Sequence, residues 1–165
     1  MKHPSTDLQS GAATESAVVK ISRSTEHQRC PGCGSTSRPV TRRTILLMLE
    51  PSLLDQLSDG IWRFCPGAEC RVVYFVEDGS FVFTTKDLRV RVGLKEREDP
   101  IHLCYCFGFD ESHVREEISR TGKCEIPQKI SALIKQGLCA CETRNPSGAC
   151  CLGEVIKTVK SLMRT

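Results

Sequence analysis

The sequence predicts an α+β protein in which a small zinc-ribbon-like antiparallel β unit packs with a short helical unit rich in cysteine. Three observations predict this class. Two cysteine pairs flank alternating apolar segments in the first half of the chain. Six of the eleven cysteines gather at the ends of helical patterns between residues 103 and 163, and only 5% of the residues are aromatic. A core this modest needs cross-links, which metal-bound thiolates supply.

Composition and charge restrict the function classes. The chain has 165 residues, of which 39% are apolar, and a formal net charge of +3 with basic and acidic residues interleaved. This balance does not indicate a nucleic-acid surface. No apolar run reaches membrane-spanning length and the polar N-terminus lacks a signal-peptide core, so we expect a cytoplasmic protein without membrane insertion. In a reducing cytosol, so many cysteines favour metal ligation over disulfides.

The chain divides into three predicted parts. Residues 1–28 are rich in Ser, Thr and Ala without a sustained hydrophobic period, so we expect a disordered tail. A β-rich unit is expected over residues 29–98, and a helical unit over residues 99–165. A charged linker at residues 96–99 separates these two units.

Two cysteine pairs on turns predict the metal site of the β-rich unit. The motif Cys30-Pro31-Gly32-Cys33 is a tight turn, and Cys65-Pro66-Gly67-Ala68-Glu69-Cys70 places a second pair on another turn. Pairs spaced C-x2-C and C-x4-C around antiparallel strands are typical of a zinc ribbon. The predicted ligands of one Zn²⁺ are therefore Cys30, Cys33, Cys65 and Cys70. Four thiolates close the coordination sphere and make this zinc structural; the alternative is four thiols without a metal.

Alternation, turns and caps predict the elements of the β-rich unit. Val40 to Thr44 reads as a short strand or strand end, Thr44 can cap a helix through Glu50, and Pro51 can start a second helix to Leu57. Strands are expected over residues 61–64, 71–76 and 81–83, with a hairpin turn at residues 77–80. A further strand is expected over residues 87–92, with Leu88, Val90 and Val92 on one face.

Helical periodicity predicts three helices in the second unit. The first begins at a cap on Asp110 or Ser112 and runs to Thr121, where Gly122 stops it. The second starts at residues 126–127 and runs to residues 136–137, and the third spans residues 152–163. Backbone N–H groups at helix ends favour thiolates. The cysteines at these ends therefore predict a metal centre, and all-sulfur ligation suits either zinc or iron–sulfur.

Several phrases carry a resemblance to a known family. They are Cys104-Tyr105-Cys106-Phe107-Gly108, Thr121-Gly122-Lys123, and Asn145-Pro146-Ser147-Gly148-Ala149-Cys150-Cys151-Leu152-Gly153, with the upstream pairs running into Arg71-Val72-Val73-Tyr74-Phe75. Over residues 29–163 the chain resembles the cysteine-rich N-terminal domain of CopZ-type archaeal copper chaperones. The resemblance implies one zinc and one 2Fe–2S cluster in a single module, without the copper-binding domain of the full-length chaperones.

The second unit taken alone is similar to the bacterioferritin-associated ferredoxin domain. That family holds a 2Fe–2S cluster with a C-x-C motif and a second cysteine pair ahead of a final helix. The present sequence departs from it, because the tight second C-x2-C is absent and the cysteines at 139 and 141 are separated from those at 150 and 151. The predicted cluster ligands within the resemblance are Cys104, Cys106, Cys141 and Cys151.

The choice of ligands leaves alternatives open. Cys104 and Cys106 lie two apart in an extended loop and can reach one iron or adjacent irons, and Cys151 begins the last helix as the final ligand of the family does. Two neighbours are rival ligands: Cys139 for Cys141 and Cys150 for Cys151. Two further residues are expected to lie outside the ligand set, namely Cys124, a bystander, and His102, a neighbour of Cys104.

The resemblance implies electron transfer, in the family the reduction of Cu(II) before copper is loaded onto a chaperone or pump. We therefore predict an electron-transfer or metallochaperone-like protein that serves copper or another heavy metal. Its expected partner is a redox or metal-trafficking protein, such as a copper chaperone or pump. The alternative is a non-redox, zinc-stapled interaction or sensor module. No catalytic base, nucleophile or phosphate loop stands out, so no enzyme activity beyond metal-ion reduction is expected.

Overall fold

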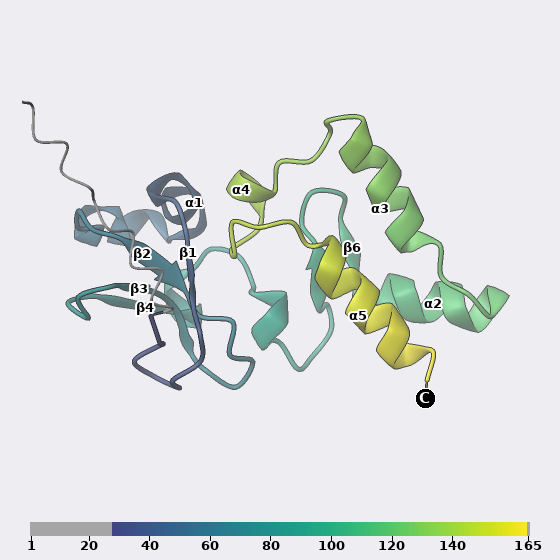
Figure 1. Ribbon diagram of the computed structural model, residues 1–165, viewed down its shortest axis with the longest axis horizontal. Coiled ribbons are helices and arrows are strands. Elements are labelled where there is room, and N and C mark those ends of the chain that lie inside the picture. Colours follow the sequence, from purple (N-terminus) through teal and green to yellow (C-terminus); the bar gives the residue numbers. More distant parts are fainter. Residues whose placement is uncertain (1–27, 165) are drawn as a thin grey trace, which may run out of the picture.

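A computed structural model describes residues 28–164, and the tail predicted over residues 1–28 lies outside the described residues except for Gln28. The sheet and the longer helices occupy opposite ends of the molecule (Figure 1). We call residues 28–95 the sheet region and residues 101–164 the helical region. The boundary predicted between residues 98 and 99 stays a prediction, and it falls between these two regions.

The sheet region is built on four antiparallel strands in the order β1-β2-β3-β4. Their bounds are Arg38–Pro39 for β1, Trp62–Phe64 for β2, Val72–Val76 for β3 and Val82–Thr84 for β4. In the register, Trp62 lies opposite Val76 and Phe64 lies opposite Tyr74. The predicted strands that became β2, β3 and β4 are confirmed, each beginning one residue later than expected. All three residues of β2 and four of the five residues of β3 are buried, so their β-branched and aromatic residues and the flanking turns mark these strands more than alternation does.

The first helix begins earlier than predicted. Helix α1 spans Arg42–Met48, and its N-cap is Thr41, whose Oγ1 accepts from the backbone N–H of Thr44 at 3.2 Å. The prediction that Thr44 caps this helix is wrong, as is the strand expected over residues 40–44. Two threonines three apart are equally able to cap, and the extended backbone of Thr41 decides between them. The segment after Pro51 is a 3-10 helix, η1, over Pro51–Gln56.

The strand predicted over residues 87–92 is also wrong. Residues Thr85–Asp87 form a 3-10 turn, η2, and Leu88 makes only an isolated bridge to Leu49. The backbone N–H of Arg89 donates to the carbonyl of Met48 at 2.9 Å, so this segment pairs with the end of α1 and does not extend the sheet. The alternation did identify the buried face, because Leu88 and Val92 lie in the core of the sheet region.

The helical region begins after a 3-10 turn, η3 (Gly93–Lys95), and a connecting segment. Strands β5 (His102–Cys104) and β6 (Phe109–Asp110) form a short antiparallel pair. Helices α2 (Glu111–Thr121), α3 (Ile126–Lys135) and α5 (Leu152–Leu162) confirm the three predicted helices, and α4 (Cys141–Arg144) is one additional turn. Asp110 caps α2 and Gly122 ends it with a φ of 72°, as expected.

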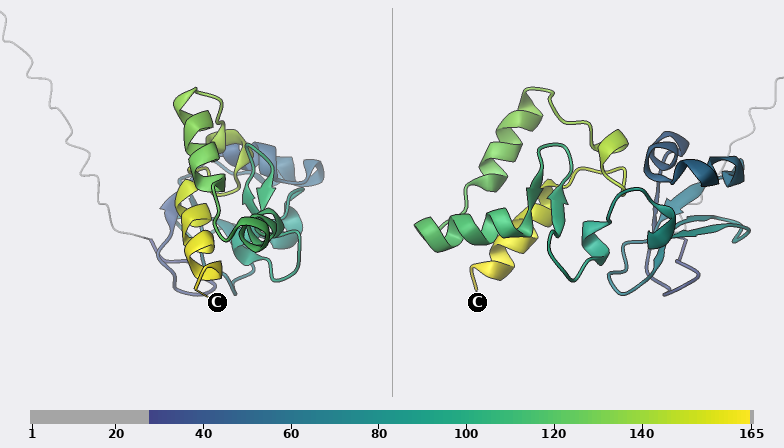
Figure 2. Two further views of the ribbon diagram at one scale, coloured as in Figure 1. Left: turned by 90° about the vertical axis from the view of Figure 1, so that its right-hand side faces the viewer. Right: turned by 180° about the vertical axis from the view of Figure 1, so that it is seen from behind.

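Each region buries its own apolar side chains. The core of the sheet region includes Trp62, Phe64 and Tyr74, and that of the helical region is formed around Val114, Ile130 and Val155. Helix α4 of the helical region lies against α1 of the sheet region (Figure 1), and the view from behind shows the same contact (Figure 2). Within residues 28–164, every helix is too short or too polar to span a bilayer.

Candidate metal centres

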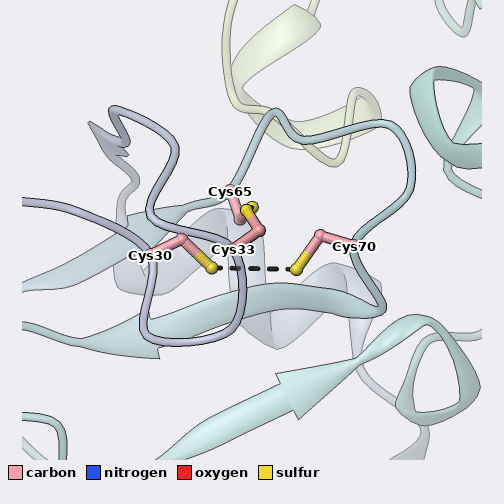
Figure 3. A group of neighbouring side chains, drawn as sticks. All are labelled: Cys30, Cys33, Cys65 and Cys70. Carbon is pink, nitrogen blue, oxygen red and sulfur yellow. Dashed lines mark hydrogen bonds between the residues drawn. The ribbon is translucent and has the colours of Figure 1, made fainter.

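Four cysteines of the sheet region converge on one point. Figure 3 shows their side chains approaching from the turn at residues 30–34 and the loop at residues 65–70. All four sulfurs lie within 4.8 Å of one another. The Sγ–Sγ distance is 3.8 Å between Cys30 and Cys70 and 3.6 Å between Cys33 and Cys65. Tetrahedral thiolates at Zn–S bonds of about 2.3 Å would lie about 3.8 Å apart. We call these residues the first cysteine site, and their geometry suits a single metal ion.

Glycines let the two turns of this site approach each other. A Cβ on Gly32 would lie 2.9 Å from Val72 Cγ2 and 3.2 Å from Cys70 Sγ, and one on Gly67 would lie 2.9 Å from Cys33 Sγ. Larger residues would therefore push the sulfurs apart. Lys95 Nζ donates to the carbonyls of Gly67 at 2.7 Å and Cys70 at 3.0 Å, which fixes the second turn.

The thiols of the first cysteine site differ in environment. Cys33 is exposed, and its contacts with the hydroxyl and backbone of Ser35 lower the pKa of its thiol to about 6. Burial raises the pKa of Cys65 and of Cys70 above the ordinary value. Buried thiols of this kind ionise readily only when a cation compensates the thiolate charge. The donor set therefore fits a thiophilic metal ion.

A second group of cysteines lies in the helical region, arranged as two pairs. Cys104 ends β5, Cys106 lies in the β5–β6 turn, Cys141 opens α4 and Cys151 is the N-cap of α5. The Sγ atoms of Cys106 and Cys141 are 3.6 Å apart, and Cys104 and Cys151 lie close enough for each thiol to shift the pKa of the other. We call these four residues the second cysteine site.

The two sites differ in geometry. Across residues 28–164, only at the first cysteine site do three or more Cys, His, Asp or Glu ligand atoms all lie within 4.8 Å of one another. The second cysteine site is therefore more open than one tetrahedron of sulfurs. Its four side chains come from three segments, namely the β5–β6 hairpin and the starts of α4 and α5, whereas two turns supply the first site.

Hydrogen bonding and burial shift the pKa values of three thiols at the second cysteine site. The hydrogen bond with Cys151 lowers the pKa of Cys104 to about 6 and raises that of Cys151. Burial is the main cause that raises the pKa of Cys141 to about 12. The backbone N–H of Ala140 donates to Cys106 Sγ at 3.3 Å. Each pair thus contains a thiol that tends to keep its proton until a cation arrives.

The rival residues lie around this site. Cys150 is exposed and Cys139 is half-buried, and the charge of Cys150 is close enough to raise the pKa of both Cys141 and Cys151. Cys124 is buried in the helical core, where its thiol donates to Glu117 Oε2 at 3.3 Å. The ring of His102 packs edge-on against Tyr105, with centroids 5.7 Å apart.

The sequence analysis did not predict a cavity and two hydroxyl contacts that lie near this site. The cavity, of about 280 Å³, lies between the two regions and is lined in part by Arg38, Cys150 and Cys151. Tyr74 and Thr44, both from the sheet region, donate hydrogen bonds to the backbone near Cys141 and Cys151. The sequence placed Tyr74 in a strand and Thr44 at a strand end or helix cap, but local patterns carry no information on partners so distant in the chain.

The fold and the two cysteine sites define a class, a small cysteine-rich metal-binding protein with a sheet and a helical region. Comparison with known proteins identifies the family within this class. A CopZ-type family described as a zinc binding domain matches residues 27–89, which include the whole first cysteine site. The X-ray structure of the Archaeoglobus fulgidus CopZ N-terminal domain is 32% identical with a TM-score of 0.64, over 78% of this chain and 95% of that one.

A curated relative extends the comparison. The protein named copper chaperone CopZ from Archaeoglobus fulgidus is 36% identical over 123 residues, which is 74% of this chain and 57% of that relative. The chain therefore spans little more than half the length of this relative. The chain belongs to the family of CopZ N-terminal domains, which confirms the predicted resemblance for its zinc-binding part.

Proposed function

We propose that this protein carries one structural zinc and one 2Fe–2S cluster and passes single electrons to copper or another heavy metal. The observation that supports this most directly is the contrast between the two cysteine sites. Four sulfurs within 4.8 Å suit one ion, whereas two separate sulfur pairs suit a centre with two metal ions. Each iron of a four-cysteine 2Fe–2S cluster takes two thiolates.

The zinc ligands in this proposal are Cys30, Cys33, Cys65 and Cys70. Four thiolates leave no open position for water or substrate, so the ion would hold the fold together without taking part in a reaction. It would join the turn before β1 to the loop between β2 and β3, and its binding energy would contribute to folding. The match of this part of the chain to a zinc-binding family supports zinc as the ion.

The proposed cluster ligands are Cys104, Cys106, Cys141 and Cys151. The 3.6 Å separation of the Cys106 and Cys141 sulfurs suits two ligands of one iron. Cys104 and Cys151, whose thiols shift each other's pKa, would serve the other iron. These contacts support Cys141 over Cys139 and Cys151 over Cys150. The bound cluster would supply one-electron chemistry, with the N–H group of Ala140 directed at the Cys106 sulfur among the groups that set its potential.

Copper is the acceptor that we propose, delivered by a redox or metal-trafficking partner in the cytoplasm. In the transfer, one electron leaves the reduced protein and converts Cu(II) to Cu(I). The thiol of Cys150 is exposed beside the cavity between the regions, and soft thiolates favour Cu(I). The named function of the curated relative supports copper as the metal, and all eleven cysteines of this chain are free thiols, which accords with a reducing compartment.

An anaerobic experiment tests this function. The reduced protein receives one equivalent of Cu(II), and the visible spectrum and a chromogenic Cu(I) chelator are followed together. We expect reoxidation of the protein to match the formation of Cu(I). If the protein stays reduced while Cu(II) persists, the copper role is wrong. A purified protein that contains zinc but is colourless would instead support the non-redox interaction module.

A further inference from the structure

The segment between two of the proposed cluster ligands is seated on the sheet region. We call residues 141–151 the ligand loop, since Cys141 and Cys151 are its ends. The Tyr74 hydroxyl of β3 donates to the carbonyl of Pro146 at 2.6 Å, and the Thr44 hydroxyl of α1 donates to the carbonyl of Glu142 at 2.6 Å. These partners are 72 and 98 residues apart in the chain. Figure 1 shows α4, the first turn of the loop, beside α1.

The ligand loop is braced internally. The side-chain carbonyl of Asn145 accepts from the N–H and the hydroxyl of Ser147, both at 3.0 Å, and its amide donates to the carbonyl of Ala149 at 2.8 Å. Asn145 and Ser147 are both buried. A loop braced in this way tends to move as one body, so contacts with its surroundings decide where its two ends lie.

The seat is close-fitting. Gly148 has a φ of 64°, and a Cβ at this position would lie 3.3 Å from both Thr44 Oγ1 and Val40 Cγ2. Glycine satisfies both the left-handed backbone and the short approach. The loop therefore touches α1 at its backbone and is held there by the hydroxyl of Thr44.

The two hydroxyls are not explained by packing alone. Tyr74 and Thr44 are fully buried, and a buried hydroxyl destabilises a protein unless it is hydrogen-bonded. Phenylalanine would fill the Tyr74 site, and valine would fill the Thr44 site. Thr44 is also not the cap of α1, since Thr41 has that role, although the two hydroxyls lie 2.9 Å apart. The two carbonyls to which these hydroxyls donate, those of Glu142 and Pro146, both belong to the ligand loop.

We propose that Thr44 and Tyr74 are positioning residues, which hold the ligand loop so that Cys141 and Cys151 face Cys106 and Cys104. The sheet region would then be a scaffold for the second cysteine site as well as the holder of the first. The part of this inference that concerns cluster ligands rests on the proposed function. The part that concerns the seat of the loop rests only on the hydrogen bonds described above.

Hydrogen exchange of the zinc-containing protein tests the seat without a cluster. In Tyr74→Phe and Thr44→Val, amides of the loop such as those of Asn145 and Gly148 should exchange roughly five- to tenfold faster, the effect of one lost buried hydrogen bond. The amide of Cys65, which donates to Val73 in the sheet, should keep its protection. Thr44→Ser retains the hydroxyl and should restore slow exchange. Unchanged exchange in the loop of both variants would overturn the proposal.

A matched control separates positioning from a general loss of stability. Thr84→Val removes a hydroxyl that bonds to Asp87 Oδ2 at 2.8 Å within the sheet region, away from the loop. In the cluster-loaded protein, an iron chelator should bleach Tyr74→Phe and Thr44→Val roughly five- to tenfold faster than wild type, with zinc content unchanged. Thr84→Val should bleach at the wild-type rate. If the chelator bleaches Thr84→Val as much faster as it does the other two variants, the faster bleaching reflects a general loss of stability, and the positioning role is overturned.

The outcomes distinguish this inference from the proposed function. A wild-type protein that binds no cluster contradicts the proposed function, and hydrogen exchange still decides whether the two hydroxyls seat the loop. A wild-type protein that binds the cluster, with variants that exchange and bleach as wild type does, leaves the proposed function intact and contradicts the positioning role.

Discussion

The two cysteine sites place their sulfurs in different ways. At the first site, two turns of one small sheet bring four sulfurs within 4.8 Å. At the second, a strand end, a hairpin turn, a single helical turn and a helix N-cap contribute one sulfur each, and the ligand loop is seated by side chains from the other region. Local turns therefore place the sulfurs of each pair at the first site and the sheet joins pairs 32 to 40 residues apart, whereas the ligand loop of the second site makes contacts 72 and 98 residues apart.

The largest expected effect follows from removing the proposed zinc. In Cys33→Ser, we expect loss of the zinc equivalent and unfolding of the sheet region, because zinc binding to such sites contributes on the order of 10 kcal/mol. Metal analysis and calorimetry measure both. Cys124→Ser is the matched control, since Cys124 lies in the helical core and belongs to neither site. A Cys33→Ser protein that keeps a full equivalent of zinc would contradict the ligand assignment.

The second prediction concerns the cysteines of the helical region. Cys141→Ser and Cys151→Ser should lose or shift the visible spectrum of a bound 2Fe–2S cluster, because each removes one member of a sulfur pair. Cys139→Ser and Cys150→Ser replace nearby cysteines that lie outside the proposed ligand set, and they should leave the spectrum largely intact. Should Cys139→Ser bleach the protein while Cys141→Ser does not, the pairing of Cys106 with Cys141 is not the one that binds iron.

The contrast between local turns and contacts across the chain also explains which features could be predicted from the sequence. The turn at Cys30-Pro31-Gly32-Cys33 could be recognised because its residue types and spacing act locally. The segment at residues 87–92 was misassigned because alternation reports a buried face and does not identify the hydrogen-bond partner, here the end of α1. The contact of Tyr74 with Pro146 joins residues 72 positions apart, and no local pattern encodes it.

The short elements near the second cysteine site were missed for a related reason. Strands β5 and β6 contain three and two residues, and α4 contains four. Elements this short give no measurable periodicity, and tertiary contacts stabilise them. The cysteines they carry were identified as candidate ligands from the family resemblance, while the pairing of their sulfurs came from the structure.

The smallest expected effect lies in the helical region away from both sites, at the corner between α2 and α3. Glu117 accepts hydrogen bonds from Lys129 Nζ at 2.7 Å, from the backbone N–H of Glu125 at 3.1 Å and from the thiol of Cys124 at 3.3 Å. The hydrogen bond with Lys129 is the main cause that lowers the pKa of Glu117 to about 2. This corner is therefore held by a carboxylate and its three donors.

The pKa of Glu117 determines the sign of the pH dependence. A glutamate in the unfolded chain titrates near pH 4.3, roughly, so the folded carboxylate stabilises the protein above that pH and loses its contribution as the pH falls toward about 2. Glu117→Gln should therefore melt slightly below wild type, by about 2–4 °C, with a constant difference from pH 8 to roughly pH 5. Below about pH 4 the two melting curves should converge. Because acid removes thiolate-bound metal from both proteins alike, their difference isolates the carboxylate. A difference that already shrinks between pH 8 and roughly pH 6 would show that Glu117 titrates close to neutrality and that Lys129 does not hold it ionised.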